Sequence, residues 1–459
     1  MTAWYTSFVS NMLFPLQERL KHHESVAIRR LLEQSQWWDR ERLEAQQVAR
    51  LHALLQHAAN HVPYYRDLFS RIGFEAGEVR SIADLSSLPF LAKADIRANL
   101  EALKSDQGRR LIRSNTGGSS GEPLIFFLGE ERVSHDVAAK WRATRWWGVD
   151  IGDPEIVVWG SPIELGAQGH LRAVRDSLMR TELLPAFEMS EEKLDDFIAR
   201  IRRRRPKMLF GYPSALAHIA RHAARRGVAM DDLGVKVAFV TSEKLYEEQR
   251  GEIERTFACA VADGYGSREG GFIAHQCPAG GMHITAEDIV VEVVDDTGRT
   301  LGPGHAGEIV VTHLASGDFP FIRYRTGDVG VLRDRKCDCG RSLPLLTEIQ
   351  GRTTDFVVAR DGTVMHGLAL IYVVRDVPGV RQFKVIQETL DRTRVLLATD
   401  RDFREVDVET IRGGIGTRLG ADVRVEIERV AEIPRETSGK YRFVVSHLAA
   451  DQFIRAGHQ

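Results

Sequence analysis

The chain contains 459 residues, of which 43% are hydrophobic, and its formal net charge at pH 7 is −2. This length exceeds what one ordinary hydrophobic core supports, so we expect two or three domains. The composition excludes a disordered chain, and the lack of a domain-scale basic excess argues against a nucleic-acid partner.

Neither a transmembrane segment nor a secretory leader is expected. No window reaches the roughly 18 consecutive apolar residues of a membrane-spanning helix. The segment 1–15 contains Trp4, Tyr5 and Phe8 but lacks a charged start, a sustained apolar core and a small-residue cleavage site. A peripheral contact by this aromatic segment is left open. The 4 cysteines are too few for a disulfide scaffold, so the cytoplasm is the expected compartment.

Hydrophobic periodicity divides the first half of the chain into alternating helices and strands. Helices are expected over about 16–59, 130–147, 191–205 and 214–226, and strands at 126–127, 155–160, 208–211 and 235–240. This alternation predicts an α/β fold with helices on both faces of a parallel sheet. In such sheets ligands bind beyond the carboxyl ends of the strands.

From Ile284 the pattern changes to β segments separated by turns, which predicts a β-rich subdomain over about 284–350. Beyond it, helices are expected at 368–375 and 406–419, and strands at 356–358, 383–389, 393–398 and 423–427. This order is typical of a compact α+β unit. We therefore expect a large N-terminal domain, 1–351, and a small C-terminal lid domain, 352–459.

The stretch from Ser114 to Pro123 has the composition of a phosphate-binding loop. Its glycines allow positive φ and close approach to a ligand, while successive N–H groups and hydroxyls can converge on anionic oxygens. It lacks the lysine of a Walker loop and leads into a β-like run, so a Walker NTPase is not expected. The candidate phosphate-binding residues are Ser114, Thr116, Gly117, Gly118, Ser119, Ser120 and Gly121.

Further motifs follow this loop along the chain. They are Tyr265-Gly266-Ser267-Arg268-Glu269, Tyr324-Arg325-Thr326-Gly327-Asp328, Gly351-Arg352-Thr353-Thr354-Asp355 and Pro434-Arg435-Glu436-Thr437-Ser438-Gly439-Lys440. In this order the motifs resemble the adenylate-forming superfamily of acyl-CoA synthetases, luciferases and peptide-synthetase adenylation domains. His61 to Tyr65 and Gly211 to Ser214 look more specifically like the phenylacetate CoA ligase branch and its relatives in polysaccharide gene clusters.

The resemblance implies an ATP-dependent carboxylate ligase. ATP and a small carboxylic acid would give an acyl or aryl adenylate and pyrophosphate, and the acyl group would then pass to a second nucleophile. In this reading Glu269 holds Mg²⁺, Asp328 accepts hydrogen bonds from the ribose, and Lys440 supplies a mobile cation in the first step. The resemblance also places Ser242, Glu243, Tyr265, Gly266, Ser267 and Arg352 at the nucleotide.

The acid-binding residues are less clearly marked, and Trp159, Tyr212 and Arg268 are the candidates. Arg268 stands where the superfamily usually has Thr or Ser, so it either meets the acid or pairs with a neighbour. The hinge position, commonly acidic or lysine in the superfamily, is Thr354 beside Asp355, which leaves the pivot residue open.

The cysteines form a second constellation. Cys337 and Cys339 form a Cys-x-Cys pair, and Cys277 and His283 lie on one short segment earlier in the chain. Three thiolates and one imidazole would complete a tetrahedral structural zinc site, with His275 as the rival fourth ligand. We expect this site to join the β-rich subdomain to the loop beside the adenine.

Several alternatives remain at this point. The acyl acceptor is CoA or an amine, the latter giving an amide-forming ligase of polysaccharide or secondary-metabolite synthesis. A non-catalytic adenylate-binding protein would keep the same fold, although Glu269, Asp328 and Lys440 argue against it. The identity of the acid and the oligomeric state, a dimer included, are not readable from the motifs.

Overall fold

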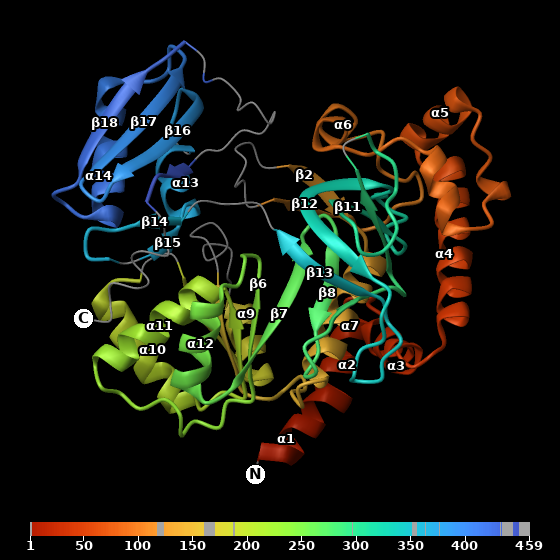
Figure 1. Ribbon diagram of the computed structural model, residues 1–459, viewed down its shortest axis with the longest axis horizontal. Helices are drawn as coiled ribbons and strands as arrows, with labels where there is room; N and C mark the ends of the chain where they lie inside the picture. Colours follow the sequence, from red (N-terminus) through yellow and green to blue (C-terminus); the bar gives the residue numbers. More distant parts are fainter. Residues whose placement is uncertain are drawn as a thin grey trace.

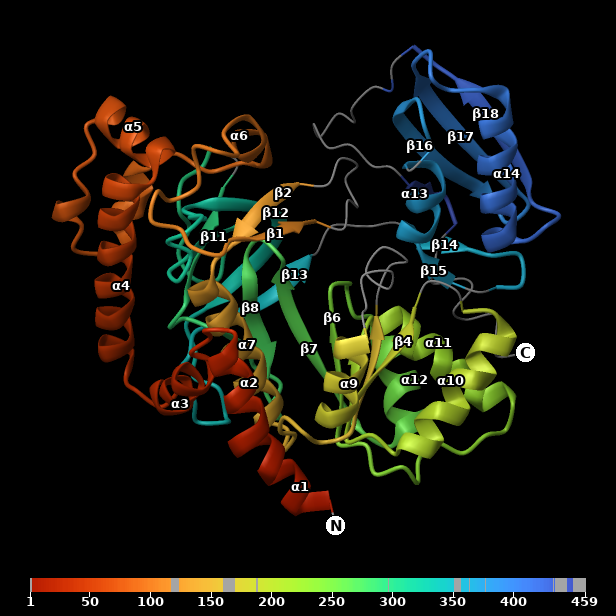
Figure 2. The same ribbon diagram turned by 180° about the vertical axis from the view of Figure 1, so that it is seen from behind.

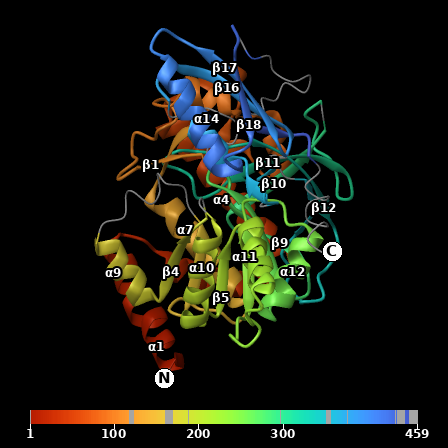
Figure 3. The same cartoon turned by 90° about the vertical axis from the view of Figure 1, so that its left-hand side faces the viewer.

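The computed structural model in Figure 1 describes residues 2–116, 124–159, 170–186, 189–295, 297–350, 356–362, 364–375, 377–431, 433 and 444–448. A large body is built around one sheet, and a smaller C-terminal unit, blue in Figures 1 and 2, carries a second sheet. Figure 3 shows the C-terminal unit and α1 (Thr2–Phe8) at opposite ends of the molecule.

The sheet of the large body has 11 strands in the order β10-β11-β12-β13-β9-β8-β7-β6-β5-β3-β4. Strands β3 to β7 pair in parallel. Strand β8 then reverses, and the pairs from β7–β8 through β10–β11 are antiparallel. The bounds are β3 (Glu155–Trp159), β4 (Thr181–Pro185), β5 (Met208–Gly211), β6 (Val237–Thr241), β7 (Ala260–Ser267), β8 (Gly271–Gln276), β9 (Met282–Ile284), β10 (Ile289–Val294), β11 (Ala306–His313), β12 (Tyr324–Arg333) and β13 (Leu345–Gln350).

The parallel strands are apolar on both sides because both faces of the sheet are covered. Strand β5 is buried along its whole length. Its Leu209 joins one core cluster, with residues of α10 (Glu191–Arg204), α11 (Pro213–Arg225) and α12 (Glu247–Phe257). Its Phe210 joins another cluster, with Ala143 of α7 (Glu130–Arg145). The α/β class and the C-terminal α+β unit expected from the sequence are confirmed.

The antiparallel strands do not form a sheet of their own. Strands β10 to β13 continue the central sheet, because Leu345 of β13 pairs with His283 of β9. The segment 284–350 is therefore β-rich as expected, but its strand β13 is joined by backbone hydrogen bonds to β9, and β9 and β8 connect it to the parallel strands.

The N-terminal part of the chain is mostly helical. The expected helical stretch 16–59 is in fact several helices, and helix formation already begins at Thr2. Pro63 ends one helix and opens the next, as its fixed φ and missing N–H allow at a first helical position. The segments are α1, the π-helical η1 (Val9–Leu13), α2 (Phe14–Leu20), α3 (Ser25–Ser35), α4 (Arg40–His61), α5 (Pro63–Ile72), the short 3₁₀ turns η2 (Ala76–Glu78) and η3 (Ile82–Ser87), and α6 (Lys93–Ala98).

The C-terminal unit has its own sheet and its own core. The sheet has 4 strands in the order β18-β17-β16-β19, and a separate hairpin joins β14 to β15. Leu370, Val395 and Ile411 lie in the core that the sheet shares with its helices. The elements are β14 (Phe356–Val358), β15 (Val364–His366), α13 (Leu368–Arg375), β16 (Val380–Thr389), β17 (Arg392–Thr399), α14 (Glu405–Leu419), β18 (Arg424–Arg429) and β19 (Val444–Ser446).

Candidate active site and metal centre

The base of the glycine loop is a closed hairpin. Strand β1 (Ile112–Asn115) pairs antiparallel with β2 (Ile125–Leu128). The Thr116 amide donates to the Leu124 carbonyl at 3.0 Å, and the Leu124 amide donates to Thr116 Oγ1, also at 3.0 Å. These bonds hold Ser114 and Thr116 at the mouth of the loop. The remaining predicted loop residues, Gly117 to Gly121, lie outside the described residues.

The motif Tyr265 to Glu269 begins in β7 and runs into the turn before β8. A Cβ at Gly266 would lie 2.4 Å from the Gly271 carbonyl oxygen, so only glycine fits this close backbone approach. Arg268 donates from its guanidinium to the Asn115 carbonyl at 2.9 Å. Of the two roles left open for Arg268, the structure shows a contact with a neighbour, and this contact ties the motif to the glycine-loop hairpin.

Asp328 joins the same group of residues. The Tyr265 hydroxyl donates to Asp328 Oδ2 at 3.0 Å, across from β7 to β12. The Asp328 amide donates to Thr326 Oγ1 at 3.1 Å, and Thr326 Oγ1 donates to the Ile309 carbonyl. The structure therefore brings the hairpin, Tyr265 and Asp328 to one side of the sheet, although they are far apart in sequence.

Glu269 is buried, with 5% of its surface exposed. Its Oε1 accepts a hydrogen bond from the Tyr324 hydroxyl at 3.0 Å and lies 3.8 Å from Lys93 Nζ at the start of α6. The Arg132 guanidinium, 1% exposed, donates to the Glu269 backbone carbonyl at 3.0 Å. Both the side chain and the backbone of Glu269 are thus held in place.

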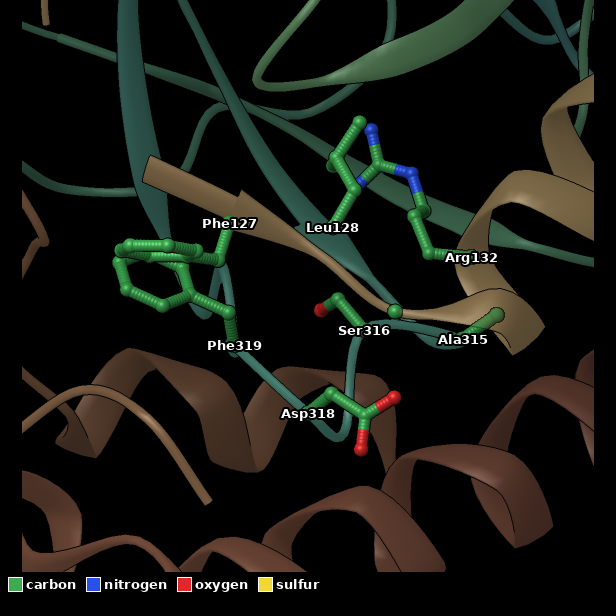
Figure 4. A pocket seen from close by; sticks show the side chains of 8 residues that line it. Phe127, Leu128, Arg132, Ala315, Ser316, Asp318 and Phe319 are labelled. Carbon is green, nitrogen blue, oxygen red and sulfur yellow. The ribbon is translucent and has the colours of Figure 1, made fainter. Parts of the chain in front are cut away.

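Sequence reasoning missed Lys93 and Arg132 as partners of Glu269. Arg132 lies in a helix rich in charged residues, where an arginine is normally expected on a solvated face. Figure 4 shows Arg132 and Asp318 on opposite sides of the segment that joins β2 to α7. The arginine is turned away from that nearby acid and toward Glu269, a direction that no local sequence pattern indicates.

The candidate acid-binding residues lie at the carboxyl ends of parallel strands. Trp159 at the end of β3 and Tyr212 after β5 stack with ring centroids 4.3 Å apart. Ser242 follows β6 with a left-handed φ of +70°, which is unusual for a residue other than glycine. Glu243 next to it accepts a hydrogen bond from the Ser214 amide at 3.3 Å. The loops after β5 and β6 are therefore linked beside the aromatic pair.

Glu243 is also electrostatically unusual. Burial raises the pKa of its carboxyl from the ordinary 4.5 to about 7, while the hydrogen bonds from Ser214 act in the opposite direction. A carboxyl with this pKa changes charge near neutral pH at the edge of the candidate site.

Replacing Glu243 with glutamine is expected to make stability less sensitive to pH. Well below pH 4.5 the carboxyl is neutral in both the folded and the unfolded chain. As the pH rises toward 7 the unfolded chain ionises first, so the wild type loses stability that the variant keeps. Between pH 5 and 8 the free energy of unfolding of the variant relative to the wild type should rise by about 2 kcal/mol. Denaturant unfolding at both pH values measures this.

The control for this prediction is Glu247→Gln, because the Glu247 side chain is 88% exposed. Its stability difference from the wild type should stay constant over the same pH range. A constant difference for Glu243→Gln as well would contradict the prediction.

The four predicted zinc ligands lie together. One ligand atom each from Cys277, His283, Cys337 and Cys339 can be chosen so that all lie within 4.8 Å of one another. Cys277 Sγ is 3.6 Å from Cys337 Sγ, and His283 Nε2 is 3.2 Å from Cys339 Sγ. Sulfur atoms bound at 2.3 Å to a tetrahedral zinc would lie roughly 3.8 Å apart, so the donor set fits that ion.

The orientation of His283 suits a metal ligand. Its Nδ1 donates to the Leu343 carbonyl at 3.2 Å, which leaves Nε2 facing the thiols. Burial lowers the pKa of His283 to about 4, so its imidazole is neutral at pH 7. The rival ligand, His275, instead stacks on Phe272 and lies outside the cluster.

The cluster joins different elements from those expected. Cys277 follows β8 and the cysteine pair lies between β12 and β13, so the site links these turns. In the Tyr265 motif, Tyr265 pairs with Ala274 of β8 and Ser267 pairs with Gly271, so these residues lie roughly 10 to 20 Å from Cys277 along that strand. Arg341, just beyond the pair, lies over the rings of Trp37 and Trp146 and donates to Gln36 Oε1 at 2.9 Å. The cluster therefore links the β12–β13 turn to the β8–β9 hairpin, and Arg341 beside it attaches the same turn to Trp37 and Gln36 of the N-terminal region.

Two further predicted site residues, Arg352 and Lys440, and the hinge candidates Thr354 and Asp355 lie outside the described residues. Among the residues that are described, no helix has the length and hydropathy needed to cross a bilayer.

Comparison with known proteins adds two family matches. Residues 184–315 match the family described as AMP-binding enzyme, and residues 357–447 match the CapK C-terminal domain. The first match contains Tyr265 and Glu269, and the second covers most of the C-terminal unit.

Curated relatives cover most of the chain. The phenylacetate-coenzyme A ligase of Thermus thermophilus is 27% identical over 88% of this chain and 97% of its own length. The protein CapK of Staphylococcus aureus is 24% identical over 81% of this chain and 82% of its own length. The phenylacetate-coenzyme A ligase of Pseudomonas putida is 28% identical over 69% of this chain and 72% of its own.

Solved structures share the fold. A 2-hydroxyisobutyryl-CoA ligase in complex with 2-HIB-AMP and CoA superposes with a TM-score of 0.65 at 19% identity, covering 92% of each chain. The same ligase in its postadenylation state gives a TM-score of 0.59 at 21% identity, covering 92% of this chain and 94% of the other. These likenesses extend over both the large body and the C-terminal unit.

Proposed function

We propose that this chain belongs to the adenylate-forming superfamily, in its phenylacetate CoA ligase-like branch, and that it activates a carboxylic acid with ATP and transfers the acyl group to CoA. In the first step a carboxylate oxygen of the acid attacks the α-phosphorus of ATP, and pyrophosphate leaves. In the second step the CoA sulfur attacks the acyl carbonyl, its proton is released, and AMP leaves.

The observation that carries the proposal is the convergence of the motif residues. The glycine-loop hairpin, Tyr265, Glu269 and Asp328 are linked by hydrogen bonds through Arg268 and Tyr324. The catalytic work in such a displacement is positioning and charge stabilisation, which need fixed donors and acceptors around the phosphates. A rigid group of this composition at the edge of a sheet supplies them.

Each residue has a role within this proposal. Asp328 accepts from the ribose hydroxyls, and Tyr265, held by its bond to Asp328, offers its ring to the adenine. Glu269 would hold Mg²⁺ through its carboxylate, which the Tyr324 hydroxyl and Lys93 keep in place. Magnesium prefers one or two carboxylates together with phosphate oxygens, and Mg²⁺ would neutralise the departing pyrophosphate. The acid lies beside Trp159 and Tyr212.

Lys440 and Arg352 complete the site in this proposal. The positive charge of Lys440 stabilises the reacting oxygens, and Arg352 contacts the nucleotide when the C-terminal unit moves. The domain boundary near residue 351 is part of the same proposal. It is supported by the separate core of the C-terminal unit.

The cysteine cluster is proposed to hold a structural zinc ion. Its four ligands leave no position for a substrate. Cys277 and His283 follow β8, whereas Tyr265 to Glu269 lie on β7 and in the turn before β8. Reduced cysteines, ATP and CoA are all consistent with a cytoplasmic protein.

The experiment that tests this function is acid-dependent exchange of pyrophosphate into ATP, followed by CoA consumption across a panel of carboxylic acids. We expect at least one acid to support both reactions. Exchange without CoA consumption, but with consumption of an added amine, would establish the amide-forming alternative. No exchange with any acid would indicate a non-catalytic adenylate-binding protein.

Replacing Lys440 with alanine is expected to remove most of the exchange activity, on the order of 100-fold, because a positioned charge that stabilises the transition state is lost. Measurement of exchange at saturating ATP and acid checks this. Lys384→Ala is the control, since Lys384 lies on β16 of the same unit, outside the motifs. Equal activity of Lys440→Ala and the wild type would contradict the role of Lys440.

A further inference from the structure

Apolar side chains are exposed along the N-terminal helix. Segments α1, η1 and α2 follow one another without a break from Thr2 to Leu20. Seven of the 12 large hydrophobic side chains that are exposed in the described residues lie on this helix and on α9 (His170–Met179). They are Trp4 at 64%, Phe8 at 41%, Met12 at 63%, Leu16 at 56% and Leu20 at 75%, with Val174 at 57% and Leu178 at 45%.

The π-helical turn keeps this row on one side. In an α-helix each step of four residues rotates the side chain by about 40° beyond a full turn, so a long row would wind around the helix. The wider turn of η1, Val9–Leu13, rotates the chain less per residue and offsets that drift. The inner face repeats at the same spacing, with Thr6, Ser10, Phe14 and Glu18 all buried.

The inner face of the helix is attached to the body by the contacts below. Because the apolar row lies on the opposite side of the helix, it faces away from the body. Thr6 Oγ1 donates to Asp153 at 2.7 Å, and Phe14 packs edge-on against Trp141. The Tyr5 hydroxyl donates to the Leu178 carbonyl at 2.9 Å, which joins the helix to α9 at one of the exposed residues of α9. We call the exposed row on the helix and α9 the N-terminal apolar surface.

Basic side chains border this surface. One wall of a groove of about 440 Å³ is formed by Asn11, Pro15 and Arg19. Each of these residues immediately precedes one of the exposed residues Met12, Leu16 and Leu20 in the sequence. The groove is also lined by Ser10, His23, Glu24, Val26, Ala27, Arg29 and Arg30, so Glu24 is its single acid. The Arg29 side chain is 10% exposed, and its guanidinium pairs with Glu33 at 2.6 Å and lies over the Trp141 ring. The exposed arginines of the groove are therefore Arg19 and Arg30.

We propose that the N-terminal apolar surface and the basic groove beside it dock the protein on the surface of a membrane that contains anionic phospholipids. Aromatic and aliphatic side chains on one face with basic residues at its border are the composition of a helix that lies in the lipid interface. The groove offers arginines to headgroup phosphates. All three views place α1 at the outermost end of the molecule, where a flat surface can reach it.

The surface is small for an interface between two copies of the chain. A 19-residue helix is about 28 Å long and about 10 Å wide, so its exposed side covers roughly 300 Å², and the 10 residues of α9 add roughly 150 Å². A stable interface needs about 800 Å² on each partner. Docking through this end would leave the opposite end, where the C-terminal unit lies, directed away from the membrane.

The test is flotation of the purified full chain with vesicles of phosphatidylglycerol and phosphatidylcholine, and with vesicles of phosphatidylcholine alone, at low and high salt. We expect binding to the anionic vesicles that weakens as the salt concentration rises. The triple variant Met12→Ser, Leu16→Ser, Leu20→Ser should bind at least about tenfold more weakly. The double variant Arg19→Gln, Arg30→Gln should lose about fivefold for each charge removed.

Matched controls are Val406→Ser, because Val406 on α14 is 57% exposed like Leu16, and Arg401→Gln at an exposed position of the C-terminal unit. Both should bind as the wild type does, and all variants should keep its thermal unfolding midpoint. The proposal is overturned if the wild type binds neither vesicle or both equally, or if the triple variant binds undiminished. It is also overturned if sedimentation shows a dimer that the triple substitution dissociates while vesicle binding is absent.

Discussion

Glu269→Gln is expected to lower acid-dependent pyrophosphate exchange by on the order of 100-fold, with the fold retained. Glutamine keeps an oxygen that accepts the Tyr324 hydrogen bond, so the change removes mainly the negative charge. In the proposed site that charge holds Mg²⁺ beside the phosphates. It also balances Lys93, whose Nζ lies 3.8 Å from Glu269 Oε1. The loss should therefore appear in kcat and in a higher Mg²⁺ requirement.

The measurement is exchange activity as a function of Mg²⁺ concentration at saturating ATP and acid, with thermal unfolding recorded in parallel. Glu247→Gln, at an 88% exposed position of α12, serves as the matched carboxylate control and should behave as the wild type. If Glu269→Gln kept the wild-type rate and Mg²⁺ dependence, Glu269 would have only a structural role.

The purified wild type is expected to contain one equivalent of zinc, and the double variant Cys337→Ser, Cys339→Ser is expected to contain none. Removing two of four ligands leaves a pair that cannot hold the ion tightly. The turn that carries Arg341 would then lose its anchor against Trp37 and Trp146. We expect the thermal midpoint to fall by roughly 5 to 10 °C, since metal affinity contributes directly to folding.

Two comparisons sharpen the zinc test. Cys259→Ser is the matched cysteine control and should retain the metal, because Cys259 lies in a separate core cluster. His283→Gln should lose zinc while His275→Gln keeps it, since only His283 contacts a cysteine sulfur. Metal analysis that found no zinc in the wild type, or equal zinc in the double cysteine variant, would remove the proposal.

The sequence predicted the C-terminal unit well because its signals are local. Apolar residues in α14 recur at helical spacing, and the expected bounds 406–419 differ from Glu405–Leu419 by a single residue. The parallel strand Met208–Gly211 was also predicted, since a short apolar run bounded by glycine and proline is typical of a buried strand. The N-terminal helix before residue 16 was missed, because its exposed face is apolar and gives no ordinary amphipathic pattern.

The partners of Glu269 could not be predicted in this way. Lys93 and Arg132 precede it by more than a hundred residues, and each reads locally as a charge on a solvated helix. The sequence also could not predict which histidine lies beside the cysteines, because His275 and His283 are cross-strand partners in β8 and β9. Only the packing around each ring separates the one beside the thiols from the one beside Phe272.

The sequence by itself therefore determined the fold class, the order of the nucleotide motifs and the composition of the cysteine cluster. These features depend on hydrophobic periodicity and on residue types that lie close together in the chain. The tertiary structure alone decided which residues hold Glu269, which histidine faces the cysteines, and that the N-terminal helix turns its apolar row outward. Those outcomes depend on contacts between segments far apart in the chain, which form only when the sheet and helices pack.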